Sequence, residues 1–463
     1  MGLKKGITYV FIANIINLII SLFTGFVLPK LLSVDTYASI KLFQLYITYI
    51  TVLHLGFSDG MYLRIGGKDI EKIDKKEMLS EFKTFKIFQV VVTSIAIIVS
   101  LILKNQILLF CSLVILPINI GDYLRQVYQA TGLFKKYSIF TNINTLLVFL
   151  VNIFLLFVIK TDDYAKYIVG YIIVYIIYWI TIEVETKKIF GRNEAKADIK
   201  YLINDVKSGF VLLIGNFCNI IFTGIDRLFV QHLLGTIKFA FYSFAVSIES
   251  LMSVFITPIS TVMYNYLCNN KEKQEVLRIK KIIVLFSAII IAVVFPAKFI
   301  IQTWIQKYND ALNVLFILFA AQYITIMVRC IHINTYKVKK QQNRYFIIMM
   351  LIVVLSIILN IILYAIFKNI EGVAIATLIT SIVWFIIGEI DFREYRLDLK
   401  KYIYIFGILI LFLICGQIPN SIVGCIVYII ITSIASFILI DDTIKIALTE
   451  GKNIVTQIVK SKT

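Results

Sequence analysis

Long apolar stretches alternate with short polar gaps along almost the whole chain. Most stretches run to about 20 residues or more, which is long enough for an α-helix to cross the hydrocarbon core of a bilayer. Helices are expected rather than barrel strands, because lipid requires each backbone N–H and C=O group to be satisfied within its own segment. The pattern predicts an all-α polytopic membrane protein with about fourteen transmembrane helices, near residues 7–31, 37–64, 83–103, 107–130, 139–159, 166–185, 208–233, 238–267, 280–304, 310–335, 345–367, 371–391, 401–416 and 421–440.

The basic residues predict the direction of these helices. Lys and Arg gather in every second gap, whereas the intervening gaps mostly hold one cation each. By the positive-inside rule, the basic side is cytoplasmic. Both termini are then cytoplasmic, as an even number of spans requires. The basic gaps are those at 4–5, 68–83, 135–136, 187–207, 271–281, 337–344 and 393–401, followed by the tail from 445 onward.

Composition excludes several other classes of protein. With 59% hydrophobic residues, the chain lacks enough polar surface for a soluble globular fold. The net charge of +18 could indicate nucleic-acid binding, but the cations are dispersed next to helix ends. There they orient the chain and contact anionic lipid headgroups, so no nucleic-acid partner is expected. The six cysteines are scattered singly and indicate packing residues, and neither they nor the three histidines predict a metal site.

An internal repeat organises the spans. Asn14, Asn17, Ser21 and Thr24 in the first span have counterparts in Asn216, Asn219, Thr223 and Asp226 of the seventh span, each displaced by 202 positions. The joint 128–137 similarly resembles the joint 334–345. Two six-helix lobes that both begin inside are parallel repeats. We therefore predict an N-terminal lobe at 1–205, a C-terminal lobe at 206–396, and two additional helices with a cytoplasmic tail at 397–463.

The repeated polar residues form one stripe on each of these two helices, because they are spaced three and four positions apart. A polar stripe is costly against lipid but tolerated against a watery cleft. We expect the stripes to line a central cavity between the lobes, with hydrogen bonding to neighbouring helices as the alternative. The predicted lining residues are Asn14, Asn17, Ser21, Asn216, Asn219 and Thr223.

Ionisable residues within the spans are candidate functional groups, because charge inside a membrane is costly unless paired or hydrated. The cations are Lys41, Arg64, Arg125, Arg227 and Arg329, and the carboxylates are Asp59, Asp226 and Glu249. Lys41, Arg64 and Arg125 could instead extend to the headgroups. Glu249 could instead be a buried partner of Arg227 or Lys41. Pro117 in the fourth span and Pro258 in the eighth permit a kink or a flexing point, because proline removes a backbone N–H.

Several short segments resemble a known family. They are residues 31–38 (LLSVDTYA), 55–64 (LGFSDGMYLR), Asp226-Arg227 before Leu234-Gly235, and 371–377 (EGVAIAT). In this order they are similar to the polysaccharide-transporter branch of the multidrug/oligosaccharidyl-lipid/polysaccharide exporter superfamily, which includes flippases of O-antigen and capsule repeat units. The resemblance covers essentially the whole chain.

The resemblance implies a flippase in the bacterial cytoplasmic membrane that moves an undecaprenyl-pyrophosphate-linked oligosaccharide outward by alternating access. On this hypothesis Arg227, Lys41, Arg329, Arg125 and Arg64 bind the diphosphate, and the polar stripes contact sugar. Asp226, Glu249 and Asp59 are candidates for ion coupling. No cofactor is expected apart from a coupling H⁺ or Na⁺. The expected partners are the lipid-linked oligosaccharide and membrane lipids, with polysaccharide polymerase and export components as further candidates.

Three alternative functions remain open. A multidrug exporter of the same superfamily would favour buried carboxylates, and a lipid II flippase of the peptidoglycan pathway would carry a similar headgroup. An integral membrane glycan polymerase or ligase would place catalytic groups on a sizeable outer loop, but the outer gaps here are only a few residues long. No zinc-protease or phosphate-loop motif is present either, so we do not expect an enzyme.

The topology can be tested by cysteine labelling in intact cells. A cysteine introduced between Lys72 and Lys76 should resist an impermeant thiol reagent, because this gap is predicted to be cytoplasmic. A cysteine at Asp162 or Asp163 should react, because this turn is predicted to be outside. The opposite labelling pattern would reverse the orientation.

Overall fold

The computed structural model describes residues 17–191, 196–269, 272–440 and 442–443. These residues form helices joined by short turns, and no strand occurs among them, which confirms the all-α prediction. Eleven described helices are long and apolar enough to cross a membrane, or thirteen if two bent pairs each count as one span. A shorter apolar helix at Asn17–Leu31 occupies the end of the predicted first span. Asn14 and the start of that span lie outside the described residues.

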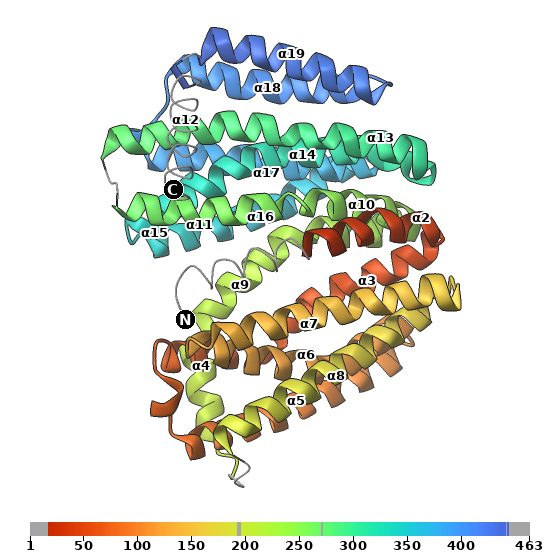
Figure 1. Cartoon of the computed structure of the whole chain (residues 1–463), viewed down its shortest axis with the longest axis vertical. Coiled ribbons are helices and arrows are strands. Elements are labelled where there is room, and N and C mark those ends of the chain that lie inside the picture. Colours follow the sequence, from red (N-terminus) through yellow and green to blue (C-terminus); the bar gives the residue numbers. More distant parts are fainter. Residues whose placement is uncertain (1–16, 192–195, 270–271, 441, 444–463) are drawn as a thin grey trace, which may run out of the picture. The chain divides into compact units, whose positions relative to one another are not determined.

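Two compact units divide the chain, Met1–Gly224 and Ile225–Thr463. The boundary lies inside one long helix, α9 (Ile199–Leu234), which contains the predicted seventh span (Figure 1).

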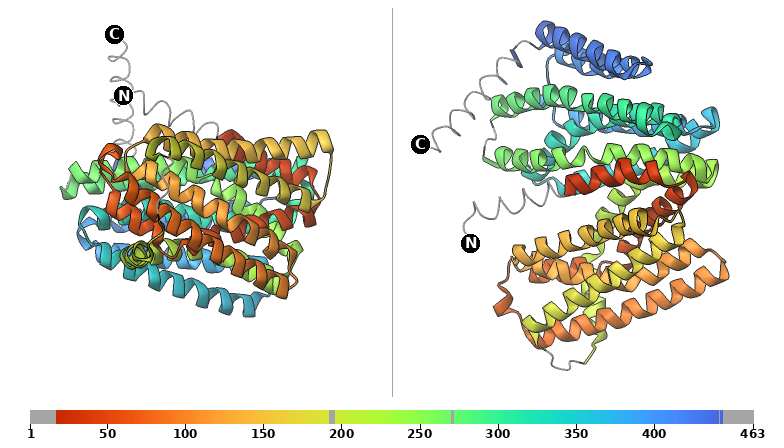
Figure 2. Two further views of the ribbon diagram at one scale, coloured as in Figure 1. Left: turned by 90° about the horizontal axis from the view of Figure 1, so that it is seen from below. Right: turned by 45° about the vertical axis from the view of Figure 1, so that its right-hand side comes forward.

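In the first unit, α6 is the central helix. It packs against α3, α4, α5, α7 and α8, and 61% of its apolar window is buried. Tyr123 and Val114 on α6 are fully buried, in two adjoining hydrophobic clusters. The described helices are α2 (Leu28–Leu31), α3 (Val34–Ile50), α4 (Phe57–Ile65), α5 (Lys75–Ile102), α6 (Gln106–Ala130), α7 (Phe134–Ile153, continued by a π-helical segment to Ile159) and α8 (Tyr164–Phe190) (Figure 2).

In the second unit, α14 has the corresponding central place. It packs against α10, α12, α17 and α18, and 78% of the apolar window of its span is buried. The last two helices pair with each other, and both are long and apolar enough to cross a membrane, as predicted for 401–416 and 421–440. The helices are α10 (Thr236–Ser250), α11 (Ser253–Asn269), α12 (Lys273–Ile290), α13 (Val294–Trp304), α14 (Leu312–Met327), α15 (Ile333–Val338), α16 (Gln342–Phe367), α17 (Ile370–Asp391), α18 (Leu399–Gln417) and α19 (Ser421–Leu439).

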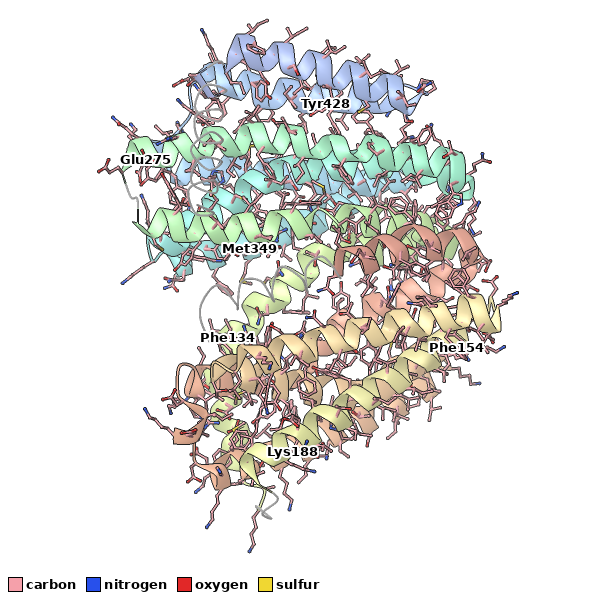
Figure 3. The ribbon with its side chains drawn as sticks, in the orientation of Figure 1. Phe134, Phe154, Lys188, Glu275, Met349 and Tyr428 are labelled. Carbon is pink, nitrogen blue, oxygen red and sulfur yellow. The ribbon has the colours of Figure 1, made fainter. Side chains whose placement is uncertain are left out.

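The outer surfaces of the helices are apolar, as contact with lipid requires. Ile102 on α5 and Ile438 on α19 are 73% and 71% exposed. Figure 3 shows side chains along the whole length of the helices, among them the exposed Phe154 and the buried Tyr428. The Tyr428 hydroxyl donates to the carbonyl oxygen of Ala288 at 2.7 Å, an ordinary O–H···O distance.

Matching turns in the two units agree with the predicted repeat. The Leu133 N–H donates to the Tyr128 carbonyl at 2.8 Å, and the Gln341 N–H donates to the Tyr336 carbonyl at 2.8 Å. Each turn ends in the left-handed backbone region, at Gly132 in one unit and at Lys340 in the other. These bonds are the six-to-one type that closes a helix C-terminus. The same sequence joint therefore has the same local geometry in both units.

Two spans are bent, but the bends do not lie at the prolines. The axes of Val34–His54 and Phe57–Ile65 differ by 60°, and the break contains left-handed Leu55 (φ 49°) and Gly56 (φ 85°). A 43° bend separates α10 from α11. Pro117 and Pro258 lie inside α6 and α11, which continue on both sides of each proline. Membrane helices tolerate proline because neighbouring groups satisfy the freed carbonyl.

Glycine residues let α4 and α9 approach backbone to backbone. A Cβ atom at Gly60 would lie 2.0 Å from the Asp205 carbonyl oxygen, and one at Gly209 would lie 2.0 Å from the Gly56 carbonyl oxygen. No side chain larger than hydrogen fits at either position without a backbone shift. This crossing fixes the bent second span against α9.

We predict that Gly60→Ala lowers the free energy of unfolding by about 1 to 3 kcal/mol, because the new methyl group overlaps backbone atoms of α9. Gly215→Ala is the matched control, since nothing lies within 4 Å of a Cβ atom there. In a helix interior this control should be neutral or stabilising by about 0.5 to 1 kcal/mol. Thermal unfolding of the purified variants in detergent measures both effects. Equal unfolding midpoints for the two variants would contradict the close crossing.

Candidate functional site

A polar cavity of about 270 Å³ lies in the first unit, where the break of the second span meets α6 and α9. Its polar lining includes His54 and Asp59 beside the break, Asn119 and Asp122 from α6, and Asn216 and Asn219 from α9. Asn216 donates from Nδ2 to Asp59 Oδ1 at 3.3 Å. The cavity holds two carboxylates among amide groups, so it can take up water and small polar or cationic groups.

The α6 side of this cavity is already paired. Arg125 reaches the Asp122 carboxylate at 2.8 Å, one helical turn away. Asn119 donates from Nδ2 to Gln89 Oε1 at 2.8 Å, and Gln89 donates to the Leu53 carbonyl at 3.2 Å. This chain of hydrogen bonds attaches α5 and α6 to the break in the second span.

A mixed-charge cluster lies in the second unit. Tyr242 on α10 donates its hydroxyl to Asp226 Oδ2 at 2.7 Å, and the Arg227 N–H donates to Asp226 Oδ1 at 2.8 Å. Glu249, further along α10, accepts a hydrogen bond from Gln322 on α14. Asp226, Arg227 and Arg329 all act electrostatically on the Glu249 carboxyl group. Four of the predicted site residues therefore belong to one electrostatic group around the Glu249 carboxyl: Asp226, Arg227, Glu249 and Arg329.

Arg329 is placed by an irregular turn. It lies in the π-helical segment Val328–His332 that follows α14. Its carbonyl oxygen accepts from the Ser260 hydroxyl on α11 at 3.1 Å, and its side chain is half-buried. π-Helical turns inside α-helices occur frequently at functional sites, because they redirect side chains.

Arg64 belongs neither to the polar cavity nor to the mixed-charge cluster. It is part of an ion network in the first unit. Its guanidinium contacts Glu77 at 3.4 Å, Asp205 at 3.3 Å and the fully buried Glu81. Tyr123 donates to the other Glu81 oxygen at 2.8 Å. Arg64 thereby joins α4, α5 and α9, and it is held by three carboxylates.

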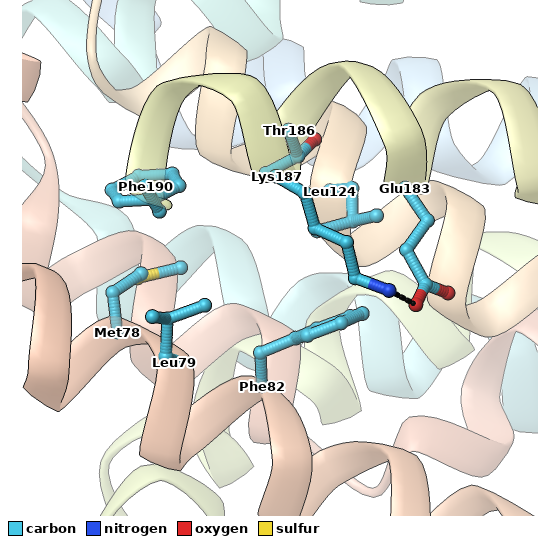
Figure 4. A pocket seen from close by; sticks show the side chains of 8 residues that line it. All are labelled: Met78, Leu79, Phe82, Leu124, Glu183, Thr186, Lys187 and Phe190. Atoms are coloured by element: carbon cyan, nitrogen blue, oxygen red, sulfur yellow. Dashed lines mark ion pairs between the residues drawn. The ribbon is translucent and has the colours of Figure 1, made fainter. Parts of the chain in front are cut away.

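Each unit also contains a Lys–Glu pair between its third and sixth spans. Lys86 on α5 contacts Glu183 on α8 at 3.0 Å, and Lys280 on α12 donates to Glu389 on α17 at 2.7 Å. Lys187 also pairs with Glu183, beside a small apolar gap (Figure 4). That gap has a volume of about 20 Å³, which is room for one water molecule and not for a substrate.

The remaining predicted residues lie apart. Lys41 on α3 has its Nζ 5.3 Å from the centre of the Tyr37 ring. Asn17 donates to Asn142 Oδ1 on α7 at 3.3 Å, which is the helix-to-helix bonding considered as an alternative. Ser21 is half-buried, and the Thr223 hydroxyl donates to the Asn219 carbonyl of its own helix at 3.0 Å. Of the two predicted polar stripes, the one on α9 contributes Asn216 and Asn219 to the polar cavity of the first unit.

Several residues of these groups are not among the site residues predicted from the sequence. Asn119, Asp122 and Gln126 line the cavity and are spaced three and four positions apart on α6, a stripe like those found in the first and seventh spans. The same test of periodicity would have found them. Nothing in the local sequence indicates that His54 faces Asp59 or that Gln322 bonds to Glu249, because both depend on tertiary packing.

The sequence profile of one family, described as polysaccharide biosynthesis protein, matches residues 3–269. The match spans more than half of the chain. This protein belongs to the polysaccharide biosynthesis protein family. The resemblance stated from the short segments is thereby confirmed. Among proteins of curated function, none matches this sequence significantly.

Solved structures similar to this family member are polytopic transporters. A structure of "Lipid II flippase MurJ, inward closed conformation" superposes with a TM-score of 0.71 at 16% identity, and the match covers 95% of this chain and 100% of the other. An inward-facing multidrug resistance MATE transporter of the MOP superfamily gives a TM-score of 0.61 at 12% identity, covering 85% and 94%. At these identities the likeness shows the fold. The chain thus has the multi-pass fold shared by flippases and exporters of this superfamily.

The ion network predicts the effect of removing Arg64. Arg64→Ala should lower the free energy of unfolding by about 3 kcal/mol, because the fully buried Glu81 loses its cation. Lys72→Ala is the control, since the Lys72–Asp69 pair is 78% and 73% exposed and should contribute less than about 1 kcal/mol. Thermal unfolding in detergent measures both. An unfolding midpoint for Arg64→Ala equal to that of the wild type would contradict the structural role of Arg64.

Proposed function

We propose that this protein is a flippase that moves an undecaprenyl-pyrophosphate-linked oligosaccharide from the inner to the outer leaflet of a bacterial cytoplasmic membrane. The substrate would be the repeat unit of a surface polysaccharide of the capsule or O-antigen type. One observation carries the proposal: this member of the polysaccharide biosynthesis protein family has a fold similar to that of a lipid II flippase. Family and fold together favour a lipid-linked glycan over other cargo.

The charges within the spans support an anionic headgroup. A diphosphate is bound best by guanidinium and ammonium groups, which pair with its oxygens through charge-assisted hydrogen bonds. Arg227 and Arg329 belong to the same cluster in the second unit, so we assign them the first contacts with the diphosphate. Lys41 and Arg125 are further contacts. Arg64 is held by three carboxylates, so its role in binding is secondary to its structural role.

The amide groups support a hydrated sugar. Asn216 and Asn219 border a polar cavity, where an amide can both donate to and accept from sugar hydroxyl groups. Asn17, Ser21 and Thr223 are additional candidates on the predicted stripes, and Asn14 lies outside the described residues. The isoprenoid chain can stay in lipid, because the outer faces of the helices are apolar. Transport would follow alternating access of the two lobes.

A second candidate is a lipid II flippase, favoured by the likeness to the MurJ structure over 95% of this chain. A multidrug exporter is a weaker alternative, because the family profile that matches this chain is described as polysaccharide biosynthesis protein. Deletion of the gene separates the candidates. Analysis of lipid-linked intermediates should show complete repeat units accumulating on the cytoplasmic leaflet. Accumulated lipid II would favour the second candidate, and unchanged intermediates with raised drug sensitivity would favour the third.

We predict that Arg227→Ala abolishes display of the surface glycan without loss of the protein from the membrane, since the diphosphate loses a cation in the low-dielectric interior. Arg227→Lys should retain part of the activity, because it keeps the charge but not the bidentate geometry. Arg393→Ala is the matched control, in an exposed turn after α17. Glycan immunoblots measure display, and membrane immunoblots measure protein. Normal display with Arg227→Ala would exclude Arg227 from the site.

A further inference from the structure

Asp59 has one carboxylate oxygen without a hydrogen-bond partner among the described residues. The residue is 5% exposed, and the unpartnered atom is Oδ2. Its Oδ1 atom accepts from Asn216. An unpartnered oxygen on a buried carboxylate is costly, because ionised groups in a poorly solvated place require a counter-charge or hydrogen bonds. Asp59 borders the polar cavity, so this cost can be relieved from there.

His54 faces the unpartnered oxygen. Its Nε2 atom lies 3.8 Å from Asp59 Oδ2, across the break of the second span. The Gly56 N–H donates to His54 Nδ1 at 3.0 Å, so Nδ1 is the acceptor and carries no hydrogen. In the neutral ring the hydrogen is therefore on Nε2, on the side of Asp59. The backbone of the break thus selects the tautomer that directs a donor toward the carboxylate.

The other charged groups at the cavity are balanced. Asp122 on α6 has Arg125 at 2.8 Å, and α9 contributes Asn216, Asn219 and apolar side chains. Asp59 is therefore the carboxylate of this cavity whose charge no described cation neutralises at ion-pair distance, apart from His54 when protonated. Among the described residues, no group of three His, Cys, Asp or Glu side chains could hold a metal ion. These features favour a proton over a metal cation.

We propose that Asp59 and His54 form a proton-binding site in the first unit, supplied by water in the polar cavity. In the uptake step, one proton from a hydronium ion bonds to Asp59 Oδ2, water is released, and the carboxylate becomes a neutral carboxyl group. His54 Nε2–H is the neighbouring donor. The His54 ring becomes positively charged only if a second proton binds to Nδ1, which replaces the hydrogen bond that Nδ1 accepts from the Gly56 N–H. Loss of the proton to cavity water reverses the step. No other bond changes.

The position of this site indicates how protonation could act on the fold. Asp59 lies one turn after the left-handed Gly56, and the following Gly60 packs directly on the α9 backbone. A change of charge at Asp59 alters its bonds to Asn216 on α9 and to His54 before the break. Protonation therefore acts at the place where α4 changes direction against α9. The link to transport rests on the proposed function, whereas proton binding itself does not.

The test uses the purified full-length protein without any lipid-linked substrate. Infrared difference spectra between acidic and neutral pH should contain a C=O stretch component from the protonated Asp59 carboxyl group, and Asp59→Asn should remove that component, hereafter the band. Asp122→Asn and the exposed Asp69→Asn are matched controls that should retain it. His54→Gln should shift the pH midpoint of the band, because the neighbouring donor changes. Size-exclusion profiles confirm that each variant is folded.

Three results would overturn the proposal. The first is a band that persists in Asp59→Asn, and the second is a band that disappears in Asp122→Asn. The third is the absence of the band from the unmodified protein together with saturable binding of ²²Na⁺ that Asp59→Asn abolishes. The last result would identify a sodium site. Transport is then measured separately with proteoliposomes and a lipid-linked oligosaccharide. A retained band without flipping would refute the proposed function and leave the proton site intact, whereas flipping without the band would refute the proton site alone.

Discussion

Charged and polar groups inside a membrane need partners, and this constraint shapes both units of the protein. Arg64 neutralises carboxylates from α5 and α9, and Lys280 neutralises Glu389 between α12 and α17. Many Ser and Thr hydroxyls donate to the carbonyl four residues earlier, as Thr141 and Thr335 do. Helices that carry ionisable residues are therefore fixed to their neighbours by those residues. Against this background, the unpartnered oxygen of Asp59 is an exception.

The two units use one architecture with different chemistry. Each has a central helix, α6 or α14, and each closes the same joint with the same turn geometry. Yet α6 carries the polar stripe that borders a cavity, whereas α14 is almost wholly apolar and buried, with Gln322 as a polar contact to Glu249. The predicted internal repeat would produce this shared packing. The differing polar residues allow the units to bind different groups.

The spans were predictable because hydrophobicity and charge are local properties of the sequence. All predicted spans after the first correspond to described helices or bent pairs, with ends displaced by up to about ten residues. The bend at Leu55 and Gly56 was not predictable, since left-handed leucine is not favoured by propensity and the break depends on packing against α9. The partners of Arg64 are distant in sequence, with Asp205 separated from it by 141 positions. A single sequence contains no signal for such a pair.

The proposed cargo and the proposed proton site can be related through the membrane potential. A bacterial cytoplasm is negative inside, so outward movement of a diphosphate headgroup is favoured by about 2.3 kcal/mol per charge for each 100 mV. Outward movement of the bound substrate then needs little further driving force. The return of the empty protein moves no substrate charge, so the membrane potential does not favour it through the substrate. A site that takes up one proton, such as Asp59 with His54, would add charge to the empty protein and couple its return to proton entry. On this argument the mixed-charge cluster of the second unit and the polar cavity of the first unit serve different halves of the cycle, which is why one protein would need both.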